Sequence, residues 1–321
     1  MAMPSNLDSQ IAYGLETTPG TRQAPSRRVE HVSFTPNPDR QIIVGKGIQA
    51  GRRTARRHYL GADKNRFTAA HELSAASCDL LLRQIMGAVS TSGSGPYDHE
   101  LTCGPLVQTD ALTVEAGVPN EGGTVDIYSF LGVQPMSGKI ACKVDELAMI
   151  DYTAAAMEFE PINTRTASAA AYSSAHDPIS WVEASLTIDA TEVPLTAFEW
   201  SFDIGLQVDR HRMRASNPQN AQVALESGFR KYGLKLDSDY ITDDHVNLFL
   251  DGTEAAVVLV LGTAADNRIT ITTNAYFDKP TGPAINGPAL ATLSQAAVMH
   301  SLTSDDAAIT INVENANSTI S

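Results

Sequence analysis

Four aspartates in one short run are the strongest candidate for metal chemistry in this chain. They lie between Asp237 and Asp244, and His245 follows directly. Several carboxylates in one loop can surround a hard cation such as Ca²⁺. The run lacks the glycine and the terminal glutamate of an EF-hand loop. A solvated loop that leads into a helix is the competing interpretation, because acidic residues favour the first turn of a helix.

Arginines form a second cluster, the only dense basic run in the chain. The run fits a solvated turn, a contact with an acidic patch on a neighbouring subunit, or a nucleic-acid contact. Because the chain has a formal net charge of −14, a second copy of it is a strong attractant for guanidinium groups. The candidate subunit contacts are Arg52, Arg53, Arg56 and Arg57.

Catalytic signatures are missing from the sequence. His71 and Glu72 lack the second histidine that a zinc-protease helix needs, so His71 is interpreted as a polar residue on a strand. Cys78, Cys103 and Cys142 are widely spaced, which favours free thiols over a disulfide framework or a zinc site. No nucleophile, base and orienting group fall at a recognised spacing. We therefore expect neither enzymatic activity nor a cofactor or metal.

Composition argues against further classes of function. The 321 residues contain 23 lysines and arginines against 37 aspartates and glutamates, which argues against tight binding of nucleic acid. No apolar run approaches the roughly 18 residues of a membrane span, so no membrane partner is expected. The first ten residues lack the features of a signal peptide, and the chain is expected to be cytosolic at synthesis.

A long alternating strand is the element around which the chain is expected to fold. Between Ala197 and Val208 every second residue is large and apolar, from Phe198 through Trp200 and Phe202. This period of two predicts a strand with one buried face and one wet face. Glu199 and Asp203 lie on the wet face, which is free to line an aqueous space.

The two halves of the chain show a similar order of predicted elements. Each half reads as a strand, an arginine-rich turn, a strand, a short helix and three further strands. The first helix is expected from Ser74 or Ser77 to about Met86, ended by Gly87, and the second starts near Thr242 and ends before Gly252. We expect a duplicated β-rich module, with halves at 1–170 and 171–321 joined by the alanine- and serine-rich stretch 167–175.

Some local predictions depend on turn-forming residues alone. The stretch from Gly14 to Thr21 and the prolines after it predict an extended arm. A hairpin is expected around Gly61, Ala62 and Asp63, and Thr91 to Pro105 is expected to be a loop.

Several stretches resemble the major tail tube protein of long, non-contractile-tailed bacteriophages. The resemblance extends over most of the chain, as soft patterns without a catalytic signature. It includes the opening Tyr13-Gly14-Leu15-Glu16-Thr17-Thr18-Pro19-Gly20-Thr21, the helix Leu80-Leu81-Leu82-Arg83-Gln84-Ile85-Met86-Gly87, the strand from Phe198 to Val208, and the segments Phe249-Leu250-Asp251-Gly252, Val257-Val258-Leu259-Val260-Leu261 and Ile269-Thr270-Ile271.

This resemblance implies a mainly β fold, a sandwich or barrel with a short packed helix, whose inner sheets join between subunits into one barrel. It implies stacked homo-oligomeric rings in the virion, assembled in the host cytoplasm, that conduct DNA during genome ejection. The tape measure protein and double-stranded DNA would occupy the lumen transiently, and tail terminator and distal tail proteins would bind the ends. Six chains per ring is the family default, and three would suffice if each chain carries two modules.

Geometry permits such a barrel. About 24 strands spaced about 4.8 Å apart and tilted by about 40° close at roughly 48 Å across, which leaves room for a DNA duplex. Glu199 and Asp203 are the lumen-facing candidates, and they would give the wall a negative potential that keeps DNA from sticking. The four arginines are then ring-contact candidates. The alternative function is a surface-exposed carbohydrate-binding β-sandwich, which the low aromatic content of 6% disfavours.

Overall fold

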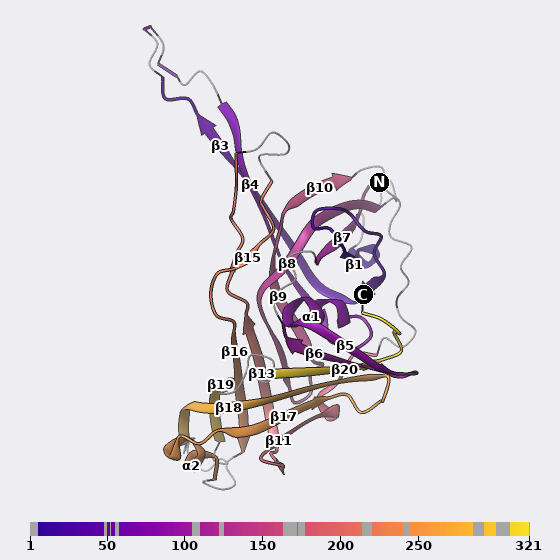
Figure 1. Cartoon of the computed structure of the whole chain (residues 1–321), viewed down its shortest axis with the longest axis vertical. Helices are drawn as coiled ribbons and strands as arrows, with labels where there is room; N and C mark the ends of the chain where they lie inside the picture. The colour runs from indigo at the N-terminus through magenta and orange to yellow at the C-terminus, as the bar shows by residue number, and fades with distance from the viewer. Residues whose placement is uncertain are drawn as a thin grey trace.

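The fold is described from a computed structural model. It describes residues 6–47, 50–51, 53–54, 58–104, 110–121, 125–162, 172, 177–213, 220–239, 244–284, 292–299 and 309–320. The predicted mainly β fold is confirmed, and strands dominate both halves of the chain (Figure 1). Within the described ranges, no helix has the length and apolar character needed to cross a membrane.

The first half of the chain contains one α-helix and ten strands in the part that the structure describes. In chain order these elements are η1 (Asn6–Asp8), β1 (Gln10–Glu16), β2 (Arg27–Val29), β3 (His31–Val44), β4 (His58–Glu72), α1 (Asp79–Met86), β5 (Gly87–Gly93), β6 (Tyr97–Cys103), β7 (Ala111–Pro119), β8 (Val125–Lys143), β9 (Met149–Ala156) and β10 (Glu158–Ile162).

The second half repeats this composition. Its described elements are η2 (Trp181–Glu183), β11 (Ala184–Ile188), β12 (Thr191–Glu192), β13 (Leu195–Asp203), β14 (Leu206–Gln207), β15 (Leu225–Glu226), β16 (Lys231–Asp239), α2 (Asp244–Asp251), β17 (Ala255–Leu261), β18 (Asn267–Ala284), β19 (Thr292–Met299) and β20 (Ile309–Asn315).

One antiparallel sheet crosses from the first half into the second. Its strand order is β3–β4–β9–β8–β13–β16–β19–β18, and we call it the shared sheet. The halves meet at β8 and β13, where Trp200 lies opposite Ile140 and Phe202 opposite Gly138. The first parts of β8 and β18 leave this sheet and pair with β7 and β10 and with β17 and β20, respectively.

Strand pairings in the two halves match one for one. β3 pairs with β4 as β13 pairs with β16, β4 pairs with β9 as β16 with β19, and β9 pairs with β8 as β19 with β18. The outer strands repeat as well, because β1 pairs with β2 and β7 while β11 pairs with β12 and β17. β5 and β6 have no counterpart among the described elements of the second half, and β6 pairs across to β20.

Two irregularities of the ladders also match, whereas the shifts between Arg40 and Ile42, between Leu112 and Val114 and between Thr281 and Ala284 have no described counterpart. The register shifts between His31 and Ser33 in β3 and between Leu195 and Ala197 in β13. A second shift falls between Pro135 and Ser137 in β8 and between Phe277 and Lys279 in β18. β-Bulges re-aim a strand at a defined place. Their recurrence aligns β3 with β13, and the later part of β8 with that of β18, residue by residue next to these two shifts.

Apolar side chains on one face of the shared sheet form the core together with α1. Trp200 is fully buried and stacks on Tyr232, with ring centroids 6.0 Å apart. The predicted helix is confirmed as α1, whose Leu81 and Ile85 are fully buried. Gly87 follows it with φ 95°, a left-handed conformation that glycine adopts without strain.

Three local predictions are wrong. The expected extended arm, Gly14 to Thr21, begins with the last three residues of β1, which pair with β7, and Glu16 is fully buried, so this part is a packed strand. The hairpin expected at Gly61 is absent, because Gly61, Ala62 and Asp63 lie within β4, where the pairing with β3 only shifts its register between Arg40 and Ile42. The loop expected from Thr91 contains β6, which is held between β5 and β20.

The alternating strand is shorter than predicted. β13 ends at Asp203, because Gly205 takes φ 66° and turns the chain away from the sheet. The stretch 167–175 lies outside the described residues except for Tyr172, and so does Thr242. α2 ends at Asp251, and Gly252 follows with φ 60° as the sequence predicts.

Candidate functional site

The wet face of the shared sheet is the first candidate surface. Along β13, Phe198, Trp200 and Phe202 are buried while Glu199 is half-buried and Asp203 exposed, as the alternation predicts. The two lumen-facing candidates therefore lie on one polar face of the sheet. The same face continues over β8, because Ser201 lies opposite Lys139 and Asp203 opposite Ser137.

Neighbouring strands balance the charge of β13. Lys139 Nζ lies 3.0 Å from Glu199 Oε2, and the bond to that carboxylate raises the pKa of Lys139. Among the described residues of β4, β9, β8, β13 and β16, this face has cations at Lys64, Arg66, Lys139, Lys143, Lys231 and Lys235 and anions at Glu72, Asp151, Glu199, Asp203, Asp237 and Asp239. The part of the face that these five strands form is therefore balanced in charge, which differs from the negative wall that β13 alone predicts.

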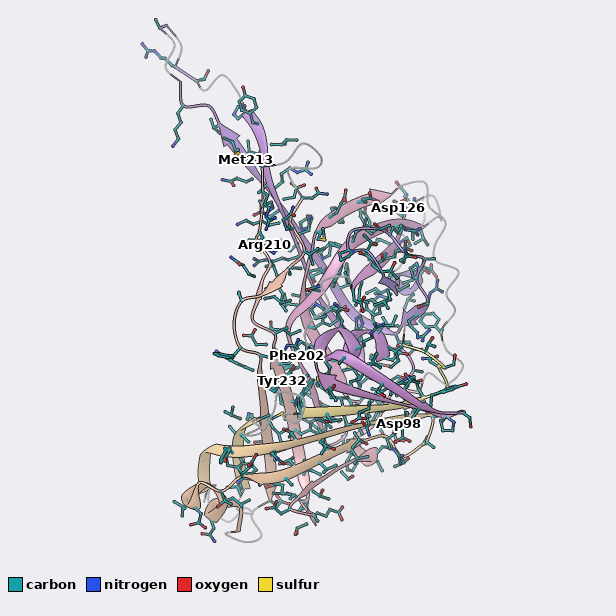
Figure 2. The ribbon with its side chains drawn as sticks, in the orientation of Figure 1. Asp98, Asp126, Phe202, Arg210, Met213 and Tyr232 are labelled. Carbon is teal, nitrogen blue, oxygen red and sulfur yellow. The ribbon has the colours of Figure 1, made fainter. Side chains whose placement is uncertain are left out.

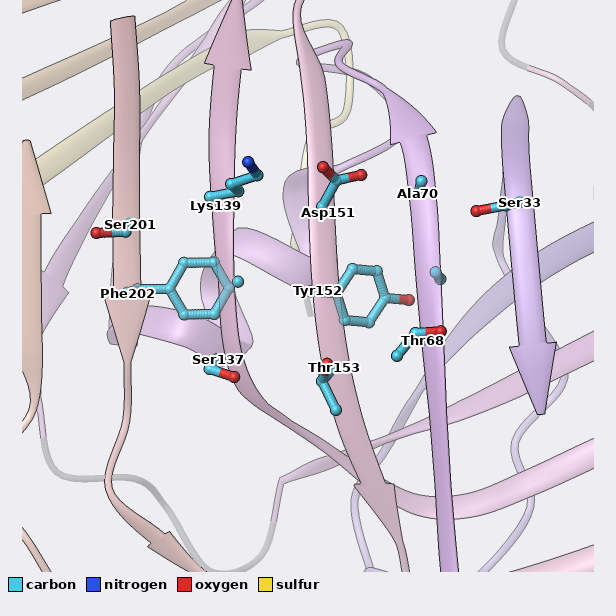
Figure 3. A pocket seen from close by; sticks show the side chains of 12 residues that line it. Ser33, Thr68, Ala70, Ser137, Lys139, Asp151, Tyr152, Thr153, Ser201 and Phe202 are labelled. Carbon is cyan, nitrogen blue, oxygen red and sulfur yellow. The ribbon is translucent and has the colours of Figure 1, made fainter. Parts of the chain in front are cut away.

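Small side chains leave a shallow depression of about 520 Å³ in the middle of this face. Figure 3 shows Ser137, Lys139, Asp151, Thr153 and Ser201 standing on adjacent strands around it. Its lining contains no histidine or cysteine, and Lys139 and Asp151 are its only charged residues. The depression has the form of a smooth wall rather than of a catalytic cleft.

The ends of the shared sheet are two open edges. β3 has β4 on one side, and β18 beyond Ala275 has β19 on one side, and no described strand pairs with their other sides. An open edge presents main-chain N–H and C=O groups that another strand can pair with. These two edges are the second candidate surface.

A long hairpin is the third candidate surface. The outer parts of β3 and β4 extend from the body of the molecule (Figure 1), and they expose large apolar side chains, among them Ile42 and Leu60, at 60% and 54%. Of the four ring-contact candidates, Arg53 is described and exposed, whereas Arg52, Arg56 and Arg57 lie outside the described residues.

The segment between β13 and β16, in the second half, contacts this hairpin, and we call this segment the excursion. Asp209 accepts a bond of 2.8 Å from Arg66 Nη2, and His211 Nε2 lies 2.9 Å from the main-chain oxygen of Asp63. Arg210 and Met213 lie along the end of the molecule that carries the hairpin (Figure 2). We call the hairpin and this excursion the arms.

Glu16, in the stretch from Tyr13 to Thr21, is a buried carboxylate whose structural role the sequence analysis did not predict. Glu16 is fully buried and accepts bonds from Gly20 N at 2.7 Å, Thr113 Oγ1 at 2.8 Å and Gly132 N at 3.0 Å. Burial raises the pKa of Glu16, and these three bonds oppose the shift. Glu16 thus joins the turn after β1 to β7 and β8.

A second missed cluster holds the end of the chain against α1. Asp79 is fully buried, pairs with Arg27 at 3.2 Å and accepts a bond of 2.7 Å from Asn317 Nδ2. Arg83 Nη1 donates to the main-chain oxygen of Ile320 at 2.6 Å. Acidic residues at a helix N-terminus are a visible signal, but the partner near the C-terminus is not predictable from the sequence.

The predictions for the acidic run and for the three cysteines have different outcomes. The described residues hold no group of three or more histidine, cysteine or acidic side chains that could bind a metal ion, and 240–243 of the acidic run lie outside them. Cys78, Cys103 and Cys142 are free, as predicted. Trp200 is buried, so it cannot take part in the exposed aromatic surface of a carbohydrate-binding module.

A model of the family described as phage tail tube protein matches residues 6–303, which is nearly the whole chain. No curated protein matches the chain. The β-rich fold with its large antiparallel sheet agrees with this match. The chain belongs to the phage tail tube protein family and is a structural component of the virion.

Proposed function

We propose that three copies of this chain form one closed ring of a tail tube. The observation that supports this proposal is the joint between β8 and β13, where two halves of matching topology already share one sheet. In this proposal residues 1–170 and 171–321 are two tail-tube modules, and the joint is repeated between chains. Three chains would supply about 24 strands, enough to close a barrel that a DNA duplex can traverse.

The matching bulges give the register of the joint between chains. Ser201 corresponds to Asn37 of β3, and Lys139 corresponds to Thr281 of β18. Since Ser201 lies opposite Lys139, Asn37 of one chain lies opposite Thr281 of the next. The open edges of the shared sheet are thereby paired, which removes the exposed edges of every chain in the ring.

In this ring the polar face of the shared sheet, with Glu199 and Asp203, lines the bore. Oppositely charged side chains on adjacent strands, such as Lys139 and Glu199, give the wall a weak net potential. DNA and the tape measure protein would then pass without strong binding in either direction. The tube would serve ejection of the genome from a long, non-contractile tail.

Stacking of rings is assigned to the arms. The hairpin carries Arg53 near its tip, and α2 and the end of β11 lie at the far end of the molecule (Figure 1). The far ends of the strands carry an excess of described acidic residues, among them Asp189, Glu192, Asp237 and Asp239. We assign the arms of one ring to this acidic end of the next, because opposite charges favour head-to-tail docking. Tail terminator and distal tail proteins would bind the two ends of the stack.

A cysteine pair tests ring formation and its register. In the proposed joint Asn37 and Thr281 face each other at a position without mutual main-chain bonds, where Cα atoms lie about 4.5 Å apart. That spacing suits a disulfide. The double variant N37C/T281C should therefore link neighbouring chains in assembled material. The internal pair K139C/S201C is the matched control, because it should link within one chain.

The oxidised product also counts the chains. Denaturing gels should show linked dimers and a closed species of three chains, and electron microscopy should show rings with three protomers. A ladder up to six chains would replace the trimer by a hexamer. Tubes that form without any linkage of N37C/T281C would contradict the proposed register, provided that the internal control closes.

A further inference from the structure

Proline residues distinguish the open edges of the shared sheet from the joint inside the chain. Pro36 and Pro38 lie on β3, opposite Phe67 and Asn65 of β4, and both prolines are exposed. Pro280 lies on β18, opposite Gln295 of β19. The inference drawn from them rests on the proposed ring, because it concerns the edges that the ring would join.

The main-chain nitrogens of these prolines point to the open edges. In an antiparallel ladder, directly opposed residues alternate between pairs that exchange both main-chain bonds and pairs that exchange none. Proline has no N–H, so Pro36 and Pro38 can occupy only the non-bonded pairs with β4. Their nitrogens then face away from β4, and by the same reasoning the nitrogen of Pro280 faces away from β19. The open edges lack an N–H donor at each of these positions.

The internal joint has no such gaps at the corresponding places. The matching bulges align Pro36 with Trp200, Pro38 with Phe202 and Pro280 with Gly138. Phe202 and Gly138 lie opposite each other in the joint between β13 and β8, and each has a main-chain N–H to donate. In the joint between chains the same pair becomes Pro38 and Pro280, which can donate none.

We propose that Pro36, Pro38 and Pro280 hold back the joining of free chains by weakening the main-chain ladder between β3 of one chain and β18 of the next. Edge prolines are a known means of preventing sheets from pairing prematurely. The sheet is thus continuous within a chain, whereas its continuation from one chain to the next requires additional contacts. Closure of a ring then depends on contacts outside the sheet, such as those that the arms make with a neighbouring ring in the proposed stack.

Replacement of the three prolines tests this proposal. The variant P36V/P38V/P280V restores three N–H donors at each joint between chains. Each restored main-chain hydrogen bond stabilises the joint between chains, so we expect the concentration at which chains assemble to fall at least about tenfold. Sedimentation velocity over a concentration series measures this value, and negative-stain microscopy identifies the product. P119V is the matched control, because Pro119 lies at the end of β7, away from both edges.

The cysteine pair separates the two possible failures. Linkage of N37C/T281C with an unchanged assembly concentration in the folded triple variant would overturn the role of the prolines and leave the ring intact. Absence of linkage in assembled N37C/T281C would overturn the proposed ring and this inference with it. A lower assembly concentration in P119V as well would also contradict the proposal, because the effect would not be specific to the edges. Thermal unfolding of each variant establishes that it is folded.

Discussion

Acidification should destabilise this protein through His71 of β4, which is buried against Tyr13 of β1 and Tyr152 of β9. His71 has no exposed surface, and its Nε2 bonds to the Tyr13 hydroxyl. Tyr152 completes the cluster, with its hydroxyl 2.6 Å from that of Tyr13. Nδ1 of His71 has no hydrogen-bond partner, so the cluster offers no acceptor for a second ring proton. Burial lowers the pKa of His71 to about 3.

The expected loss of stability follows from the difference between this pKa and that of an unfolded histidine, about 6.5. Above pH 6.5 the ring is neutral in both states, and the full stability is present. As the pH falls below 6.5, the unfolded chain takes up a proton that the folded chain refuses, so stability declines until the pH approaches 3. The loss between pH 7 and pH 5 amounts to about 2 kcal/mol.

Comparison with H71F isolates this contribution. Tyr13, Tyr152 and Cys78 stay neutral in this range, because burial raises the pKa of each. His31 also titrates with a lowered pKa, but it is present in both proteins. Urea unfolding at pH 7 and at pH 5 gives the free energy of unfolding of each protein.

The wild-type chain should lose about 2 kcal/mol more than H71F between the two pH values. Tyr13 and Tyr152 keep their mutual bond in the variant, so it should remain folded. Equal losses in the two proteins would refute the reasoning, because His71 would then take up its proton in the folded state.

Three substitutions test the packing that holds the assembly surfaces in place. Glu16→Ala should lower the free energy of unfolding by about 3 kcal/mol or more, because three donors lose their acceptor, and urea unfolding measures it. Trp200→Ala should cost about 3–5 kcal/mol by leaving a cavity beside the joint of the two halves, and a stability within 1 kcal/mol of wild type would contradict its placement. Asn317→Ala removes a donor to buried Asp79 and should cost about 1–3 kcal/mol, with faster amide exchange in α1 as a second readout.

Elements with one wet face were predictable from the sequence. β13 and β16 alternate along most of their length, so Phe198, Trp200 and Leu234 could be assigned to the core. α1 follows a helical spacing and ends at Gly87, which takes the expected conformation. In each case the spacing of apolar residues within one segment is enough to predict the element and its buried face.

Elements that are covered on both sides were not predictable in the same way. β1 lies between two strands and buries Ile11, Ala12 and Tyr13 in succession, so it lacks a period of two. Gly14 and the prolines that follow β1 suggested an arm, although Gly14 is required because a Cβ there would lie 2.9 Å from the main-chain oxygen of Ala24. Close packing between distant segments overrides turn propensity at this position.

The charge of the wet face could not be obtained from one strand. Glu199 and Asp203 are both on β13, and their alternation placed them correctly on the polar side. Their effect depends on Lys139 and Lys235, which β8 and β16 place opposite or beside them. Only the pairing of strands far apart in the sequence shows that the face is balanced.

In the proposed ring, the matching topology of the two halves gives one chain two kinds of joint with the same geometry. The joint between β8 and β13 forms during folding, and its edges carry Trp200, Phe202 and Gly138 with all their main-chain donors. The corresponding edges at β3 and β18 remain open in the free chain, and prolines lie at matching positions. A strand edge that stays unpaired until another chain binds can aggregate. An edge that is already paired within the chain cannot pair in this way. The edges at β3 and β18 therefore carry prolines because they are expected to be paired only on assembly. The edges at β8 and β13 lack prolines where they pair with each other, because they are paired during folding.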